Sequence, residues 1–289
     1  DGTLTGSITD NSFSADLSGV RNPWATATPT VPALMVFNTA LGRPDSVTDN
    51  PLFPQGNGYV IHKLSPTGTI SSSGRLAEGT SFTFSSHMGP LGQLPVHALL
   101  YDKTGSIQGD STIERASELV AGSLSWFKIQ QSSKSTTRSY QSGIPLHSLH
   151  VRGSRYIKPS GMIIGLDTPL TTPPEDNAKV RFSGLPLNPF FEYTFPITAA
   201  NSPKIPTAFA ANPQALKMKL DAKTGLFSGS FFISVPDPLD LTEPFTMLKR
   251  TPTYQGLLVT HPELMAGVGY FLLNELPDAP GEKLTNTPI

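Results

Sequence analysis

The chain contains no cysteine and little charge. Asp, Glu, Lys and Arg make up 15% of its 289 residues, against about 25% in an average globular protein. Without cysteine, the chain has no disulfide framework and no thiolate zinc site. The 22 acidic and 21 basic residues give a net charge of −1. They form no basic stripe of the kind that binds nucleic acid or a membrane surface, so we expect neither partner.

Long apolar runs and helical periodicity are also missing. No apolar run reaches the ~18–20 residues of a membrane helix, so no membrane insertion is expected. Helical spacing is confined to very short segments such as 213–216. No signal peptide is visible at Asp1. A strand-like run at 2–8 and the abrupt end at Ile289 predict a mature fragment or module of a longer protein.

One turn sequence, in contrast, occurs three times, at 65–68 (SPTG), 102–105 (DKTG) and 221–225 (DAKTG). Each copy lies between two runs of alternating apolar and polar residues. Each ends in a glycine that can adopt the positive φ of a tight hairpin turn. This pattern is typical of a β-meander, in which consecutive strands pair.

Glycine and proline punctuate the whole chain. The 25 Gly and 28 Pro are spread throughout, which predicts many short elements. Strand-like runs recur every 10–15 residues between them. The expected strands are 34–37, 58–64, 69–73, 81–85, 96–101, 106–113, 119–129, 146–151, 162–166, 179–183, 191–195, 216–220, 226–233, 254–259 and 269–273.

These strands predict an all-β, antiparallel fold. Open sheet edges favour aggregation, so we expect a closed or nearly closed up-and-down barrel, with a packed β-sandwich as the alternative. The chain is interpreted as one large β domain over 1–289, and the proline-rich segment 168–177 is the best candidate for an internal boundary. Residues expected in the core are Leu100, Leu124, Trp126, Leu149, Val151, Phe182, Leu220, Phe231, Leu258 and Phe271.

Two short motifs are typical of serine acyl-enzymes of the penicillin-recognising kind. Ser125 and Lys128 have the Ser-x-x-Lys spacing, and Lys-Thr-Gly occurs at 103–105 and 223–225. That chemistry needs the serine and lysine one helical turn apart on the same face. The segment 124–129 is strand-like, which places the two side chains on opposite faces. We therefore interpret these matches as coincidental.

Metal-binding patterns are weak. His147 and His150 are three residues apart on an expected strand, so they would point to opposite faces, and neither His87 nor His97 completes a recognisable ligand set. Oxygen ligands for calcium are available at Asp237, Asp240 and Glu243, and more weakly at Asp45, Asp49 and Asn50. Neither group has the spacing of a known calcium loop. We expect solvated loops, and no metal or cofactor.

Two sugar-related hypotheses remain open. Paired carboxylates for glycoside hydrolysis can come from distant strands, and the candidates are Glu114, Glu118, Asp167 and Glu192. Trp24, Tyr140 and Tyr156 lie in or beside expected loops, where exposed rings could form a platform for glycan binding. Ordinary core or loop packing is the simpler interpretation of all three rings.

The order of glycines and aromatic residues carries a resemblance. The matching segments are 68–82, 100–109, 122–126, 151–156, 224–231, 254–258 and 267–271. In this order, residues 58–276 resemble β-rich segments of large exported proteins of verrucomicrobial and planctomycete bacteria. The resemblance implies export and a place in a long modular surface protein. It transfers no catalytic residue.

We therefore expect a non-enzymatic extracellular module, secreted or at the cell surface, with a structural, adhesive or assembly role. Its expected partners are other copies of the chain or neighbouring domains of a longer protein, joined by strand addition at an open edge. The alternatives are a carbohydrate-binding module and a glycan- or ester-cleaving enzyme.

Overall fold

A computed structural model describes residues 2–24, 34–132, 140–161, 176–183, 190–262 and 264–273, together with residues 276 and 279. Within these residues every strand pair is antiparallel. The described helices are three-residue 3₁₀ turns: η1 (Asp45–Val47), η2 (Tyr101–Lys103) and η3 (Phe209–Ala211). None of them could cross a bilayer. The all-β, antiparallel prediction is confirmed.

The strands fall into one large sheet and four small ones. The large sheet contains β3 (Met35–Gly42), β4 (Gly58–Leu64), β5 (Thr69–Arg75), β6 (Ser81–His87), β7 (Gln93–Leu100), β8 (Gly105–Glu114), β9 (Leu119–Lys128) and β10 (Ile144–Arg155). The small sheets contain β1 (Thr3–Thr9) with β2 (Ser14–Val20), β11 (Ala178–Ser183) with β12 (Phe190–Phe195), β15 (Ile233–Pro236) with β16 (Met247–Arg250), and β13 (Lys217–Asp221), β14 (Leu226–Ser230), β17 (Thr253–His261) and β18 (Leu264–Leu272).

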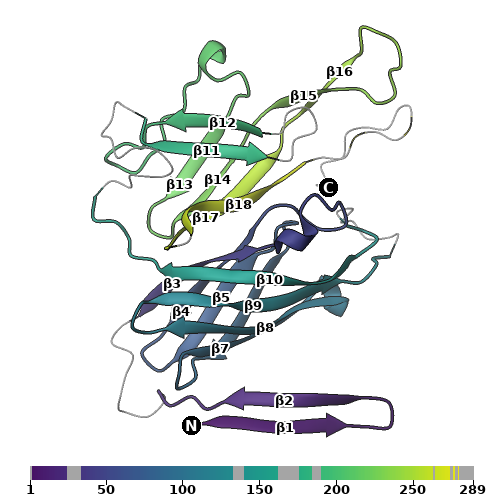
Figure 1. Ribbon diagram of the computed structural model, residues 1–289. Coiled ribbons are helices and arrows are strands. Elements are labelled where there is room, and N and C mark those ends of the chain that lie inside the picture. Colours follow the sequence, from purple (N-terminus) through teal and green to yellow (C-terminus); the bar gives the residue numbers. More distant parts are fainter. Residues whose placement is uncertain are drawn as a thin grey trace.

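The large sheet is an up-and-down barrel that is nearly closed. Its strand order is β6-β5-β4-β3-β10-β9-β8-β7, so each strand pairs with its neighbour in the chain except at two places. The first barrel strand, β3, pairs with the last barrel strand, β10, and this pairing closes the ring. The remaining gap lies between β6 and β7, which are close in space but not hydrogen-bonded as a ladder. The predicted meander barrel is confirmed (Figure 1).

Alternating side chains fill the barrel. Along β7, Leu94, Val96, Ala98 and Leu100 are buried while His97 is exposed, because successive side chains of a strand point to opposite faces. The same alternation on the other strands builds a single apolar cluster. Full burial of each large apolar side chain contributes about 1.5–3 kcal/mol relative to exposure. The barrel is therefore a packed core, as expected for eight strands.

A few polar side chains interrupt this core. His62 on β4 and Ser72 on β5 are buried, and Nδ1 of His62 lies 2.8 Å from Oγ of Ser72. Among the described residues, neither Nε2 of His62 nor Oγ1 of the buried Thr39 has a hydrogen-bond partner. Burial lowers the pKa of His62 to about 4, so its imidazole is neutral at physiological pH.

The four-stranded sheet β13-β14-β17-β18 packs on the outside of the barrel, against β3, β4 and β10. Leu257 and Tyr270 meet Tyr59 on the barrel, and Val259 meets Ala40. The other face of β17 and β18 packs against the β11–β12 hairpin. Rings from both sides build this second core: Phe182, Phe191, Phe231, Tyr254 and Phe271.

Asn38 links the barrel to the four-stranded sheet β13-β14-β17-β18, called the outer sheet below. Its Nδ2 donates to the carbonyl oxygens of Thr224 and Leu258, both at 2.9 Å. The hydroxyls of Ser154 and Thr260 are hydrogen-bonded at 2.7 Å, and the Tyr59 hydroxyl donates to Gln255 at 3.3 Å. Polar groups thus fix the contact between the two sheets at several points.

The three predicted turns all join consecutive strands, but one differs in its backbone. Gly68 and Gly225 adopt positive φ, at 75° and 77°. In the turn between β7 and β8, positive φ falls instead on Tyr101, Asp102 and Lys103, at 54°, 52° and 73°. The expectation that Gly105 would supply it was wrong. Gly105 already belongs to β8, where an added Cβ would meet the Tyr101 ring.

Most of the predicted core is buried. Eight of the ten residues named from the sequence are buried, whereas Leu220 and Phe271 are partly buried. The expected strand 162–166 and most of the proposed boundary 168–177 lie outside the described residues. The described strands before that boundary form the β1–β2 hairpin and the barrel, and those after it form the other three small sheets.

Candidate functional sites

One end of the barrel carries a buried polar network. Glu78, in the turn between β5 and β6, is 6% exposed, and its carboxylate accepts from the backbone N–H of Thr80 at 2.6 Å. It also accepts a short hydrogen bond from the Tyr101 hydroxyl. Nε1 of Trp126 donates to that hydroxyl at 3.1 Å, and Nζ of the buried Lys128 lies 4.9 Å from the Tyr101 ring centroid. Three segments of the barrel, the β5–β6 turn, the β7–β8 turn and the end of β9, therefore meet around Glu78 and Tyr101.

Burial and the Glu78 charge set the proton affinities in this network. Burial, and then the nearby carboxylate, raise the pKa of Tyr101 far above its usual value, so it stays a hydrogen-bond donor. Burial also lowers the pKa of Lys128, an effect that the Glu78 charge opposes. The pKa of Tyr140 is raised to about 12 for the same two reasons. Each hydroxyl thus keeps its proton at physiological pH.

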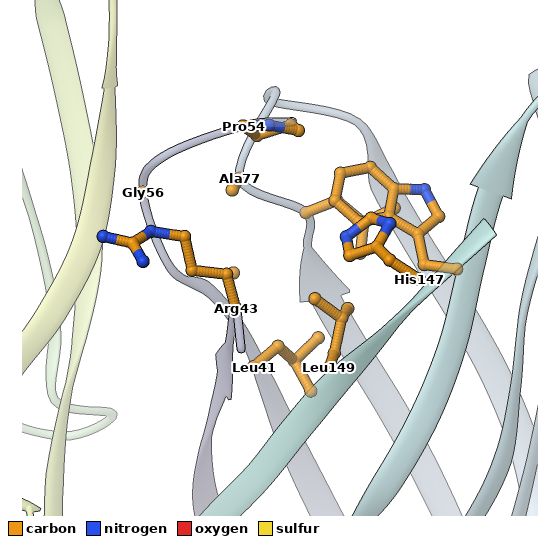
Figure 2. Close-up of a pocket in the computed structure, with 10 residues that line it drawn as sticks. Leu41, Arg43, Pro54, Gly56, Ala77, His147 and Leu149 are labelled. Carbon is orange, nitrogen blue, oxygen red and sulfur yellow. The ribbon is translucent and has the colours of Figure 1, made fainter. Parts of the chain in front are cut away.

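Beside this network lies a small hollow (Figure 2). About 220 Å³ of space between atoms lies among residues that include Leu41, Ala77, Trp126 and His147, but none of it admits a water-sized sphere. The Arg43 side chain turns away from His147 (Figure 2), and its Nε donates to the Gln55 carbonyl. This hollow gives a substrate no room, and we interpret the described part of this end as a packed closure.

The opposite end is closed by Trp24. Its indole is 4% exposed, and Nε1 donates to the Met88 carbonyl at 3.1 Å. The guanidinium of Arg115 lies over the ring, 4.6 Å from its centroid. Trp24 belongs to the apolar cluster of the barrel. The ring acts as a plug, and neither face is open for a sugar to stack on.

The other two rings proposed for glycan binding are only partly exposed. Tyr140 packs against the barrel cluster near Glu78. Tyr156 follows β10, and its hydroxyl donates to the Ala222 carbonyl at 2.9 Å. Trp24 and Tyr140 close opposite ends of the barrel, so the three rings do not form one platform.

Two of the carboxylates proposed as calcium ligands accept hydrogen bonds from backbone N–H groups of their own loop. Oδ1 of Asp237 accepts from the N–H of Leu239, and the carboxylate of Asp240 accepts from Thr242 and Thr246. Glu243 is exposed in the same connection between β15 and β16. Among the described residues, no group of three or more His, Asp or Glu side chains is placed to hold a metal ion.

The motifs typical of catalysis are also dispersed. Ser125 points out of the barrel and Lys128 into it, as the strand interpretation predicts, and both Lys-Thr-Gly segments lie at hairpin turns. Glu114 accepts from Ser117, whereas Glu118 and Glu192 form ion pairs with arginines. Asp167 lies outside the described residues.

A surface groove of about 500 Å³ was not predicted from the sequence. It runs beside the ends of β8 and β9 and includes His261, at the end of β17. Its walls are Pro90, Leu91, Thr112, Glu114, Arg115, Leu119, Ala121 and His261. The groove is formed by residues from three distant parts of the chain, so no local sequence motif could have predicted it.

The least protected surface is the hairpin β1–β2. Apart from its base, where Gly2 approaches Pro90 and Val20 approaches Gly89, it extends from the body of the protein (Figure 1). Leu4, Leu17 and Ile8 are 71%, 46% and 50% exposed. The register places these three side chains on one face of the ribbon. Neither outer edge pairs with another described strand.

No family model matches this chain, and no curated protein and no solved structure is significantly similar to it. The resemblance to exported bacterial proteins and the functional expectations drawn from it stay predictions.

Proposed function

We propose that this chain is a non-enzymatic assembly module of an extracellular bacterial surface protein, and that it joins other protein chains by strand addition through the hairpin β1–β2. The observation that carries the proposal is the hairpin itself. Its edges carry backbone groups that pair with no other described strand, and one of its faces is apolar and exposed. Two-stranded hairpins are at best marginally stable alone in water, so a further strand would stabilise this one.

The hairpin also lacks most of the devices that keep an edge strand from pairing. Natural edge strands are shielded by lysines, prolines, bulges or a covering element. Strands β1 and β2 contain no lysine, proline or bulge, and their only charged residue is Asp16. Backbone hydrogen bonds to an added strand would supply affinity, and the apolar side chains would supply specificity.

The rest of the described molecule fits a rigid support for this hairpin. The barrel core is filled and both ends are closed, by Trp24 at one end and the Glu78 network at the other. The low charge and the resemblance to exported proteins support a location outside the cell or at its surface. The buried or half-buried rings weigh against a carbohydrate-binding module, and the dispersed carboxylates weigh against a glycan- or ester-cleaving enzyme.

The proposal can be tested in the cells that produce the protein. A photo-reactive phenylalanine derivative is placed at Ser7 on β1, and in a control chain at Leu146, which is 68% exposed on β10. Illumination is expected to give protein adducts in good yield from position 7 and few from position 146. Equal yields, or no adduct from position 7, would overturn an assembly role for the hairpin.

A further inference from the structure

The outer edge of β1 presents a regular set of backbone groups that pair with no other described strand. Gly2 accepts from the N–H of Arg21, and Asp10 donates to the carbonyl of Phe13, so these pairs are hydrogen-bonded across the hairpin. Hydrogen-bonded pairs alternate along an antiparallel ladder, and the register then makes Leu4, Gly6 and Ile8 the residues that bond to β2. The odd residues of β1 direct their N–H and C=O groups away from β2. These residues are Thr3, Thr5, Ser7 and Thr9.

The sequence of β1 is nearly the same in both directions. Read outwards from Gly6, Thr5 matches Ser7, Leu4 matches Ile8, and Thr3 matches Thr9. An antiparallel partner with the same sequence, centred on Gly6, would therefore place hydroxyl residues opposite hydroxyl residues and apolar residues opposite apolar residues. A two-fold interface requires this self-complementarity, because each patch meets its own copy.

We infer that the strand added to β1 is β1 of a second copy of this chain, paired antiparallel about Gly6. This inference rests on the proposed function and names its partner. The odd residues supply the hydrogen-bonded pairs, Thr5 with Ser7 and Thr3 with Thr9, and Gly6 meets Gly6 in a non-hydrogen-bonded pair. The product is a four-stranded sheet in the order β2-β1-β1-β2.

Apolar contacts and charge agree with this arrangement. Leu4 of each copy lies opposite Ile8 of the other, on the face that already carries Leu17, so the exposed apolar stripes join into one. Strand β1 has no charged residue, so two copies meet without repulsion. The edge of β2 is less suited, because Asp16 adds a charge to it and β2 faces the barrel (Figure 1).

The absence of cysteine makes the register directly testable. In the proposed pairing, positions 4 and 8 of the two copies form a non-hydrogen-bonded pair with Cα atoms about 4.5 Å apart, within the range of a disulfide. The purified full chains L4C and I8C are oxidised separately and as an equimolar mixture. We expect the mixed disulfide to form at least about tenfold faster than either self-disulfide.

Hydrogen bonding at the edge is tested by a matched pair of prolines. Thr5→Pro removes an outward N–H from β1, and Ser18→Pro removes one from the outer edge of β2. Sedimentation equilibrium of the wild-type chain is expected to show a dimer. Thr5→Pro should weaken it by about tenfold or more, given the loss of two hydrogen bonds per dimer, and Ser18→Pro should leave it unchanged.

A wild-type chain that stays monomeric at high concentration, or cysteine variants with no preference for the mixed disulfide, would overturn the second copy as partner. If position 7 still gave adducts with another protein in cells, the assembly role would stand and only the identity of its partner would be wrong. Loss of both results would remove the proposed function itself.

Discussion

Inside the barrel, Nδ1 of His62 lies 2.8 Å from Oγ of Ser72, and no described residue forms a hydrogen bond with the opposite ring nitrogen, Nε2. The imidazole is buried, and burial lowers its pKa from 6.5 to about 4. The unfolded chain binds a proton near pH 6.5, whereas the folded chain does not until about pH 4. The stabilising effect of the neutral imidazole is therefore complete above pH 6.5 and is lost as the pH falls towards 4.

Between pH 7.5 and pH 4.5, this histidine should reduce the free energy of unfolding by about 2–3 kcal/mol. His62→Gln removes the titration and should flatten that part of the pH dependence in urea unfolding. The exposed His97 on β7 provides a control, since His97→Gln should leave the profile unchanged. If the His62→Gln variant kept the wild-type pH profile, the buried imidazole would not be the cause of the loss of stability at low pH.

Replacement of Asn38 should loosen the outer sheet. Asn38→Ala removes two hydrogen bonds and leaves the buried Leu258 carbonyl without this donor, at a cost of about 1–3 kcal/mol. Asn38→Asp keeps the shape but turns acceptors towards two carbonyl oxygens, so it should be at least as destabilising. Faster hydrogen exchange at the Leu258 amide, which donates to Gly225, would locate the effect. Wild-type exchange and stability in both variants would contradict this role.

The hydroxyl of Tyr101 should contribute to stability through the Glu78 network. Tyr101→Phe removes the donor to a buried carboxylate and the acceptor for Trp126 Nε1. We expect a loss of about 1–3 kcal/mol in the free energy of unfolding. Tyr193→Phe offers a comparison, because its hydroxyl donates to Gln214 near the surface. A loss no larger than in that comparison would mean that the network adds nothing.

Trp24 should act as a core residue. Trp24→Ala leaves a cavity at the closed end of the barrel and should cost about 3–5 kcal/mol, whereas Trp24→Phe refills part of it and should cost less. Thermal and urea unfolding of the two variants measure the difference. If Trp24→Ala matched the wild-type stability but lost binding on a glycan array, the ring would be a ligand contact instead.

The meander could be predicted because its information is local. Turn glycines such as Gly68 and alternating runs such as β7 are visible over a few residues. The three positive φ values at 101–103 could not be predicted, because Tyr101 is held there by long-range contacts with Glu78 and Trp126. The burial of Lys128 could be predicted, because Lys128 lies two residues after the buried Trp126 on the same strand and therefore points to the same side. The exposed hairpin was only half predicted: the run 2–8 was recognised, but the strand at 14–20 was not.

Because β3 pairs with β10, the barrel can close only late in the synthesis of the chain. The ring cannot close until β10 has emerged, and ribosomes add roughly 5–20 residues per second. The edge of β3 (Met35–Gly42) therefore waits on the order of ten seconds for its partner Ile144–Arg155. During that interval an apolar strand is exposed to other nascent chains, and long-range closure is intrinsically slow. We expect the yield of folded protein to depend on chaperones that hold this edge until the last barrel strand arrives.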